Sequence, residues 1–148
     1  MIQYVPLAAC AAILPILCYG AYTDWKDRII PNRVPLTILV LGFFTVGGFI
    51  YKFLSLGLLV LLMVVATLLT KKKSGGGDIK LYMAMGFALG LLNLAVVLFL
   101  TIVLYSSFRF VKKVPKTERF PVCSFVAPAY AIYFIAFIAF PALKGVLV

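Results

Sequence analysis

Long apolar stretches alternate with short polar segments along this chain. Uncharged apolar runs cover about residues 5–23, 34–51, 53–70, 79–108 and 122–143. Strongly polar segments separate them at residues 24–33, 71–78 and 109–121. Because about 20 consecutive apolar residues form a helix that crosses the hydrocarbon core of a bilayer, this pattern predicts an all-α polytopic membrane protein.

The run at residues 79–108 decides how many helices there are. As one helix it would be about 45 Å long, which is too long for one upright crossing and short for two. Gly90 and Asn93 offer a turn within it. The distribution of positive charge supplies a second criterion.

If the run is divided, all three polar segments fall on one side of the membrane. That side then carries twelve of the fourteen Lys and Arg residues, and only Lys52 and Lys144 lie opposite. Cytoplasmic loops collect Lys and Arg, whereas a single long helix would place the five cations of residues 109–119 outside. We therefore predict six transmembrane helices, with both termini outside and the three basic loops in the cytoplasm.

Composition supports this class, since 65% of the residues are hydrophobic and the mean hydropathy is +1.16, values outside the range of soluble domains. Residues 1–148 are expected to form a single transmembrane domain. The start of the first run has no Lys or Arg, unlike a secretory signal peptide, so we expect this run to persist as a helix. The basic loops are expected to contact anionic lipid headgroups, and no soluble face is available for nucleic acid.

The residue types present exclude several kinds of catalytic site. The chain has no histidine, so neither a His-Glu-x-x-His zinc site nor a Ser-His dyad is possible. The three cysteines show no Cys-x-x-Cys spacing and are interpreted as small buried apolar residues. Ser74 beside Lys73 lies in a flexible loop without fixed geometry. We expect no metal and no cofactor, and two carboxylates remain the strongest candidates.

Asp24 and Asp78 each stand where a polar segment meets an apolar run. Placing an ionisable group at the edge of a membrane-spanning helix costs several kcal/mol of free energy unless the group is paired or hydrated. Such a group therefore indicates a functional site. Two carboxylates that meet in space share one proton, so one form activates water while the other protonates a carbonyl oxygen. Gly75, Gly76 and Gly77 permit positive φ and close approach of another segment.

Other interpretations of the two aspartates stay open at this point. Asp78 is also suited to an ordinary helix N-cap after a glycine linker, and Asp24 to an interfacial ion pair with Lys26 or Arg28. A small membrane transporter or accessory subunit would use the two acids as a proton or cation relay. Relay acids usually lie deep in a span, whereas these lie at span ends.

Two motifs carry a family resemblance. The sequence Asp-Trp-Lys-Asp-Arg-Ile-Ile-Pro-Asn runs from Asp24 to Asn32, and Gly-Gly-Gly-Asp-Ile-Lys runs from Gly75 to Lys80. Together they resemble the prepilin peptidases, the type IV leader peptidases of the GxGD aspartyl class. The resemblance implies that Asp24 and Asp78 are catalytic and that the surrounding motif residues support the substrate or the loops: Gly75, Gly76, Gly77, Pro31, Asn32 and Lys80.

Asp27 competes with Asp24 for the first catalytic position. We prefer Asp24 because its seven-residue distance to Pro31 fits the family spacing and because it abuts the first apolar run. The chain lacks the added N-terminal region with paired Cys-x-x-Cys motifs found in long bacterial members, so N-methyltransferase activity is not predicted.

The resemblance implies the substrate and the location. It implies removal of the short basic leader from pilin-like or preflagellin-like precursors, by a multi-pass enzyme of the cell membrane whose active site faces the cytoplasm. A GxGD protease that cuts inside transmembrane helices is the enzymatic alternative.

Overall fold

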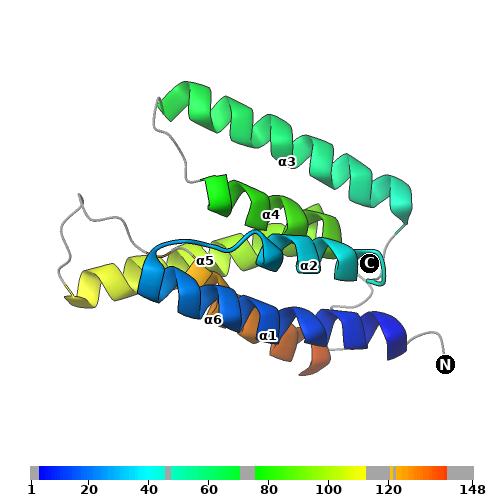
Figure 1. The fold of residues 1–148 in the computed structure, drawn as a ribbon, viewed down its shortest axis with the longest axis horizontal. Coiled ribbons are helices and arrows are strands. Elements are labelled where there is room, and N and C mark those ends of the chain that lie inside the picture. Colours follow the sequence, from blue (N-terminus) through cyan, green and yellow to red (C-terminus); the bar gives the residue numbers. More distant parts are fainter. Residues whose placement is uncertain (1–3, 46–47, 71–75, 113–120, 122, 140–148) are drawn as a thin grey trace.

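Six α-helices form in the part of the chain that the computed structural model describes. It covers residues 4–45, 48–70, 76–112, 121 and 123–139, and for residues 4–6, 62–70 and 112 it describes the backbone alone. The helices are α1 (Tyr4–Asp27), α2 (Arg33–Gly42), α3 (Phe49–Thr70), α4 (Gly76–Leu89), α5 (Leu91–Lys112) and α6 (Cys123–Ala139) (Figure 1). The prediction of an all-α protein is confirmed.

The long run at residues 79–108 breaks at Gly90, as its sequence allowed. Gly90 has φ of 81°, a left-handed conformation that a residue without Cβ adopts readily. Its N–H donates to Gly86 O at 2.9 Å and closes α4, while its carbonyl accepts the Leu94 N–H at 3.0 Å. One residue thus separates α4 from α5.

Helix lengths do not reproduce six equal membrane crossings. Two segments, Leu7–Asp27 in α1 and Leu91–Val111 in α5, are each 21 residues long and apolar enough to span a bilayer. With 10 residues, α2 is about 15 Å long, and α4 with 14 residues is about 21 Å. The hydrocarbon core of a bilayer is about 30 Å thick, so α2 and α4 are shorter than a full crossing. The division into six helices is correct for the described residues. Six membrane crossings remain a prediction.

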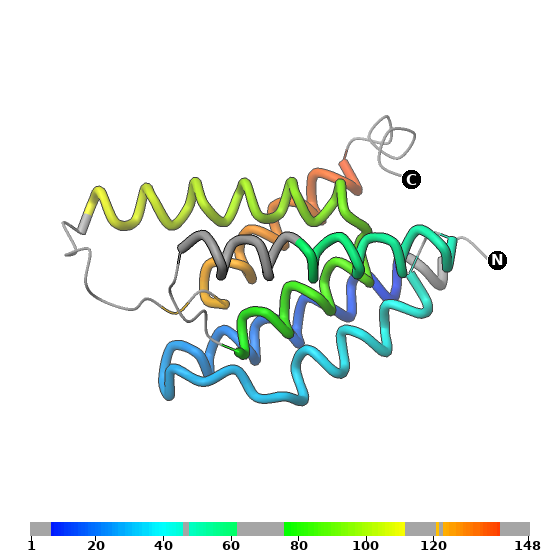
Figure 2. Tube along the Cα trace, turned by 90° about the horizontal axis from the view of Figure 1, so that it is seen from above, coloured from blue at the N-terminus to red at the C-terminus, as the bar shows by residue number. Residues whose placement is uncertain are grey.

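Helix α4 lies at the centre of the bundle. It packs against α2, α3 and α5, and α1 packs against α2 and α6 (Figures 1 and 2). Fully buried side chains from five helices form the core, among them Ile13, Ile38, Met85, Leu94 and Tyr130. The end of α1, the start of α4 and the start of α6 lie at the same end of the bundle (Figure 1).

Glycines allow α4 to approach its neighbours closely. A methyl group added at Gly86 would lie 1.9 Å from Leu59 Cδ1 of α3, and one added at Gly42 of α2 would lie 2.8 Å from Phe87 Cδ1. Both distances are far below van der Waals contact. The position of α4 therefore depends on these two small residues.

Lys52, expected on the side opposite the basic loops, is buried in the structure. Only 3% of its surface is exposed. Its Nζ donates to the carbonyl oxygens of Gly42 and Thr45, the second at 2.8 Å, so the ammonium caps the C-terminal end of α2. Lys144, expected on the same side, lies outside the described residues.

We expect Gly86→Ala to lower the stability of the bundle by about 1–3 kcal/mol, because the new methyl group overpacks the contact with Leu59. Thermal unfolding in detergent measures this effect. Gly57→Ala in α3 is the control, since nothing lies within 4 Å of a methyl group added there. Equal melting temperatures for the two variants would contradict the packing role of Gly86.

Candidate active site

Asp24 lies in the last turn of α1 and is almost fully buried. It is 6% exposed, and its Oδ2 accepts a hydrogen bond of 2.8 Å from the backbone N–H of Cys123, the first residue of α6. The next residue strengthens the same junction, because the Ser124 hydroxyl donates to Ala21 O at 3.0 Å. A buried carboxylate thus links the end of α1 to the start of α6.

The chain reverses direction directly after this carboxylate. The Arg28 N–H donates to Asp24 O at 3.1 Å and closes α1. Arg28 itself has φ of 56°, a left-handed conformation that costs a non-glycine residue about 1–2 kcal/mol. The turn leads residues 29–32 back toward α4, and the positive charge of Arg28 acts on Asp24.

Asp78 lies in the first turn of α4 and is half-buried. Burial raises the pKa of its carboxyl, and the negative charge of Asp24 raises this pKa further. The two aspartates, 54 positions apart in sequence, therefore lie close enough in space to influence each other's ionisation. The structure brings together the two side chains that the sequence singled out.

The other motif residues join the two segments that carry the carboxylates. Lys80 Nζ donates to Asn32 Oδ1 at 3.0 Å, and a methyl group added at Gly77 would lie 3.3 Å from Ile30 Cβ. The half-buried Pro31 accepts the Val34 N–H at 3.0 Å where α2 begins. Residues 28–32 are thus held against the first turn of α4.

The glycines before Asp78 act differently from one another. Gly76 and Gly77 are helical residues of α4 and do not have a positive φ, so the expectation of positive φ is wrong for both. Among the described glycines, the positive φ is at Gly90. Gly77 does permit close approach, whereas a methyl group added at Gly76 would have nothing within 4 Å. Gly75 lies outside the described residues.

Asp27, the alternative first aspartate, ends α1 and is exposed. Lys26 next to it is exposed as well. The alternative interpretation of Asp24 as an interfacial partner of Lys26 or Arg28 is incomplete. The charge of Arg28 does act on Asp24, but Asp24 is buried and its hydrogen bond joins it to α6.

Tyr82 and Cys123 also lie near the two carboxylates, and the sequence did not single them out for this. Both lie within electrostatic range of Asp24 and Asp78. Tyr82 follows Asp78 by four residues on α4, a spacing that places both on one helix face and could have been recognised. Of the three cysteines expected to be buried, Cys123 is fully buried, Cys10 is half-buried and Cys18 is exposed, so the expectation is wrong for Cys18. The contribution of Cys123 to the site is a backbone N–H, which leaves no sequence pattern.

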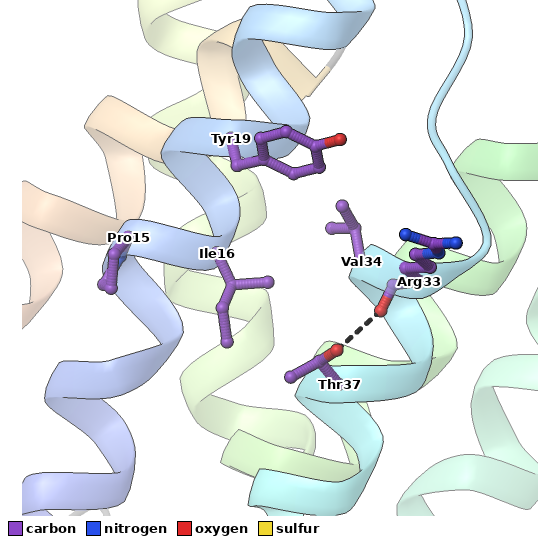
Figure 3. Close-up of a pocket in the computed structure, with 6 residues that line it drawn as sticks. All are labelled: Pro15, Ile16, Tyr19, Arg33, Val34 and Thr37. Atoms are coloured by element: carbon purple, nitrogen blue, oxygen red, sulfur yellow. Dashed lines mark hydrogen bonds between the residues drawn. The ribbon is translucent and has the colours of Figure 1, made fainter.

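A shallow groove lies elsewhere on the surface, between α1 and α2. Its volume is about 310 Å³, and the residues that line it are Pro15, Ile16, Tyr19, Arg33, Val34 and Thr37 (Figure 3). The Thr37 hydroxyl donates to Arg33 O at 2.8 Å within it. Neither carboxylate lines this groove, so it is separate from the candidate active site.

Comparison with known families gave one match. The model of a family described as the type IV leader peptidase family matches residues 11–109, a range that includes both aspartates and ends before α6. Comparisons with curated proteins and with solved structures gave no significant match. The family resemblance inferred from the sequence motifs is thereby confirmed.

The proximity of the two carboxylates predicts a measurable coupling. We expect Asp24→Asn to lower the pKa of Asp78, because the substitution removes the negative charge that disfavours ionisation of Asp78. The chain has three aspartates, so ¹³C NMR of protein labelled at aspartate Cγ resolves each one during a pH titration. Asp27→Asn serves as the matched control. An Asp78 titration unchanged by Asp24→Asn would mean that the pair is not coupled.

Proposed function

Because this chain belongs to the type IV leader peptidase family, we propose that it is an aspartyl endopeptidase in which Asp24 and Asp78 form the catalytic pair. Membership makes it a protease of the leader peptidase type, with a precursor protein as substrate. Its two long apolar helices and its family together indicate membrane association.

One observation carries this proposal: a buried carboxylate on α1 and a half-buried carboxylate on α4 lie within electrostatic range of each other. Two such groups cannot both ionise cheaply, so at intermediate pH they hold one proton between them. A pair in this state contains both a general base and a general acid.

The chemistry of peptide cleavage follows from that state. The ionised carboxylate takes a proton from water as the water oxygen bonds to the scissile carbonyl carbon, and the protonated carboxyl gives its proton to the carbonyl oxygen. The resulting gem-diol returns one proton to the pair as its C–N bond breaks. The other carboxyl protonates the departing amine, so that one water is consumed and the pair again holds one proton.

We propose pilin-like precursors as the substrates, cleaved between their basic leader and their apolar segment on the cytoplasmic side. Positive residues lie near the carboxylates in sequence and structure: Lys26 and Arg28 at the end of α1, Arg33 at the start of α2 and Lys80 near the start of α4. This positive charge does not favour binding of a basic leader. We therefore infer that the apolar segment of the precursor, retained in the lipid, supplies most of the binding free energy.

We expect Asp24→Asn and Asp78→Asn each to reduce precursor processing by about 10²–10⁴-fold, because either substitution removes half of the acid–base pair. Co-expression with a pilin-like precursor, followed by a gel-shift assay of precursor against mature product, measures the effect. Recovery of each variant in the membrane fraction shows that the loss is chemical.

Asp27→Asn is the matched control, since it neutralises an exposed carboxylate three positions from Asp24. It should retain substantial processing. An inactive Asp27→Asn beside an active Asp24→Asn would reverse the assignment of the first aspartate.

The rate should depend on pH as a bell-shaped curve. Activity is lost as the pH falls through the lower apparent pKa of the pair, because both carboxyls become protonated, and as it rises through the higher one, because both ionise. Burial and the charge of Asp24 raise the pKa of Asp78 and so move the alkaline limb upward.

A rate–pH profile in detergent or liposomes, with and without a chelator, checks this expectation. We expect no effect of the chelator, because the chain has no histidine and no clustered cysteines to bind a catalytic metal. Chelator-sensitive cleavage, or a rate that still rises at alkaline pH, would contradict the aspartyl mechanism.

A further inference from the structure

The two carboxylates have different surroundings. Asp24 accepts the N–H of Cys123 at 2.8 Å, and the backbone N–H of Ser124 acts on it as well. Both amides belong to the first turn of α6, where backbone N–H groups have no partner within the helix. Asp78 stands in the first turn of its own helix, α4, and is affected by the charge of Asp24. Burial disfavours ionisation of both carboxyls and is the largest effect on each, so the N–H donors of α6 distinguish Asp24 by opposing it.

We propose that the first turn of α6 is a positioning element that keeps Asp24 ionised and leaves the shared proton on Asp78. This inference rests on the proposed catalytic pair and assigns each member its role. It concerns a helix that begins beyond residues 11–109, the range matched by the family model.

The physical reason is the preference of N–H donors for the charged form of an acceptor. A hydrogen bond to a carboxylate is about twice as strong as one to a neutral acceptor, and the positive end of the α6 dipole adds to this preference. The other groups near Asp24 are Arg28 at the end of α1, Asp78 and Tyr82 on α4, and the Cys123 thiol on α6. Of these, Arg28 also favours the ionised form, while the Asp78 charge is absent when Asp78 holds the proton.

The assignment gives the reaction a direction. Asp24 takes the proton from water as the water oxygen attacks the scissile carbonyl carbon, and Asp78 donates its proton to the carbonyl oxygen. When the C–N bond breaks, Asp24 gives the proton it received to the departing nitrogen, and Asp78 recovers one from the gem-diol. The pair thus ends in its starting state.

Titration of the unmodified protein tests the assignment directly. Protein labelled with ¹³C at aspartate Cγ gives three signals, and that of Asp27 is identified with Asp27→Asn. Between the two titration steps of the pair, we expect Asp24 at the ionised chemical shift and Asp78 at the protonated one. The reverse order would overturn the inference.

A backbone substitution tests the role of α6. Cys123→Pro removes the N–H donor, and proline suits the first position of a helix, where this N–H has no intrahelical partner. We expect the Asp24 titration and the acid limb of the rate profile to move upward by about one pH unit, and the processing rate to fall about 10-fold or more, since one charged hydrogen bond is lost. Cys123→Ala keeps the N–H and should therefore move the Asp24 titration much less than Cys123→Pro does.

Different results would contradict the role of α6 and the catalytic pair of Asp24 and Asp78. An Asp24 titration that is unchanged in Cys123→Pro, or that moves as far in Cys123→Ala as in Cys123→Pro, would show that α6 does not act through its N–H. Processing that survives Asp24→Asn would instead contradict the catalytic pair itself, whatever the order of titration.

Discussion

The hydrogen bond between the Cys123 N–H and the Asp24 carboxylate joins α1 to α6, the first and last of the described helices, through residues 99 positions apart. A buried carboxylate costs free energy unless donors compensate for the lost water. Here the compensation comes from backbone amides that α6 cannot satisfy internally, so each partner removes a penalty of the other. Neither the end of α1 nor the start of α6 could move away without leaving buried polar groups unpaired.

Around this junction, close packing fixes the position of the second carboxylate. Helix α4 is held against α2 and α3 at Gly42 and Gly86, where a single added methyl group would collide with a neighbouring side chain. The Lys80–Asn32 hydrogen bond and the contact of Gly77 with Ile30 fix its first turn, which carries Asp78. The position of the Asp78 carboxyl therefore depends on Gly86, about two turns further along α4, and on Gly42 of α2.

Sequence patterns predicted the helices well and their lengths less well. Apolar runs marked all six helices, and Gly90 marked the break between α4 and α5, because hydrophobic periodicity and left-handed glycine are local properties. The run at residues 34–51 is not one helix, since α2 ends at Gly42, whose carbonyl accepts a hydrogen bond from Lys52 Nζ. Such a contact between a side chain and a distant helix end depends on tertiary structure.

In the candidate site, too, sequence motifs identified some residues, whereas other contacts depend on tertiary structure. Motif spacing identified Asp24, Asp78, Asn32 and Lys80, and the structure brings their segments together. No sequence pattern could identify the N–H donor from α6, because every residue except proline carries a backbone N–H. The sequence did not predict the burial of Lys52 for a related reason. A lysine between two apolar runs is expected in an interfacial loop, and only the structure shows the carbonyl groups that bind it.

The short central helices have a consequence for the surrounding lipid. The apolar segments of α1 and α5, at 21 residues, match the thickness of a bilayer, but α2 and α4 are roughly half to two thirds as long. For a chain embedded in a bilayer, this difference in length requires the lipid to thin beside α2, and it leaves room for water at the ends of α4, which lies at the centre of the bundle. Asp78 begins one of these short helices, so hydration and the polar backbone of a precursor would reach the carboxylates without crossing a full leaflet of lipid.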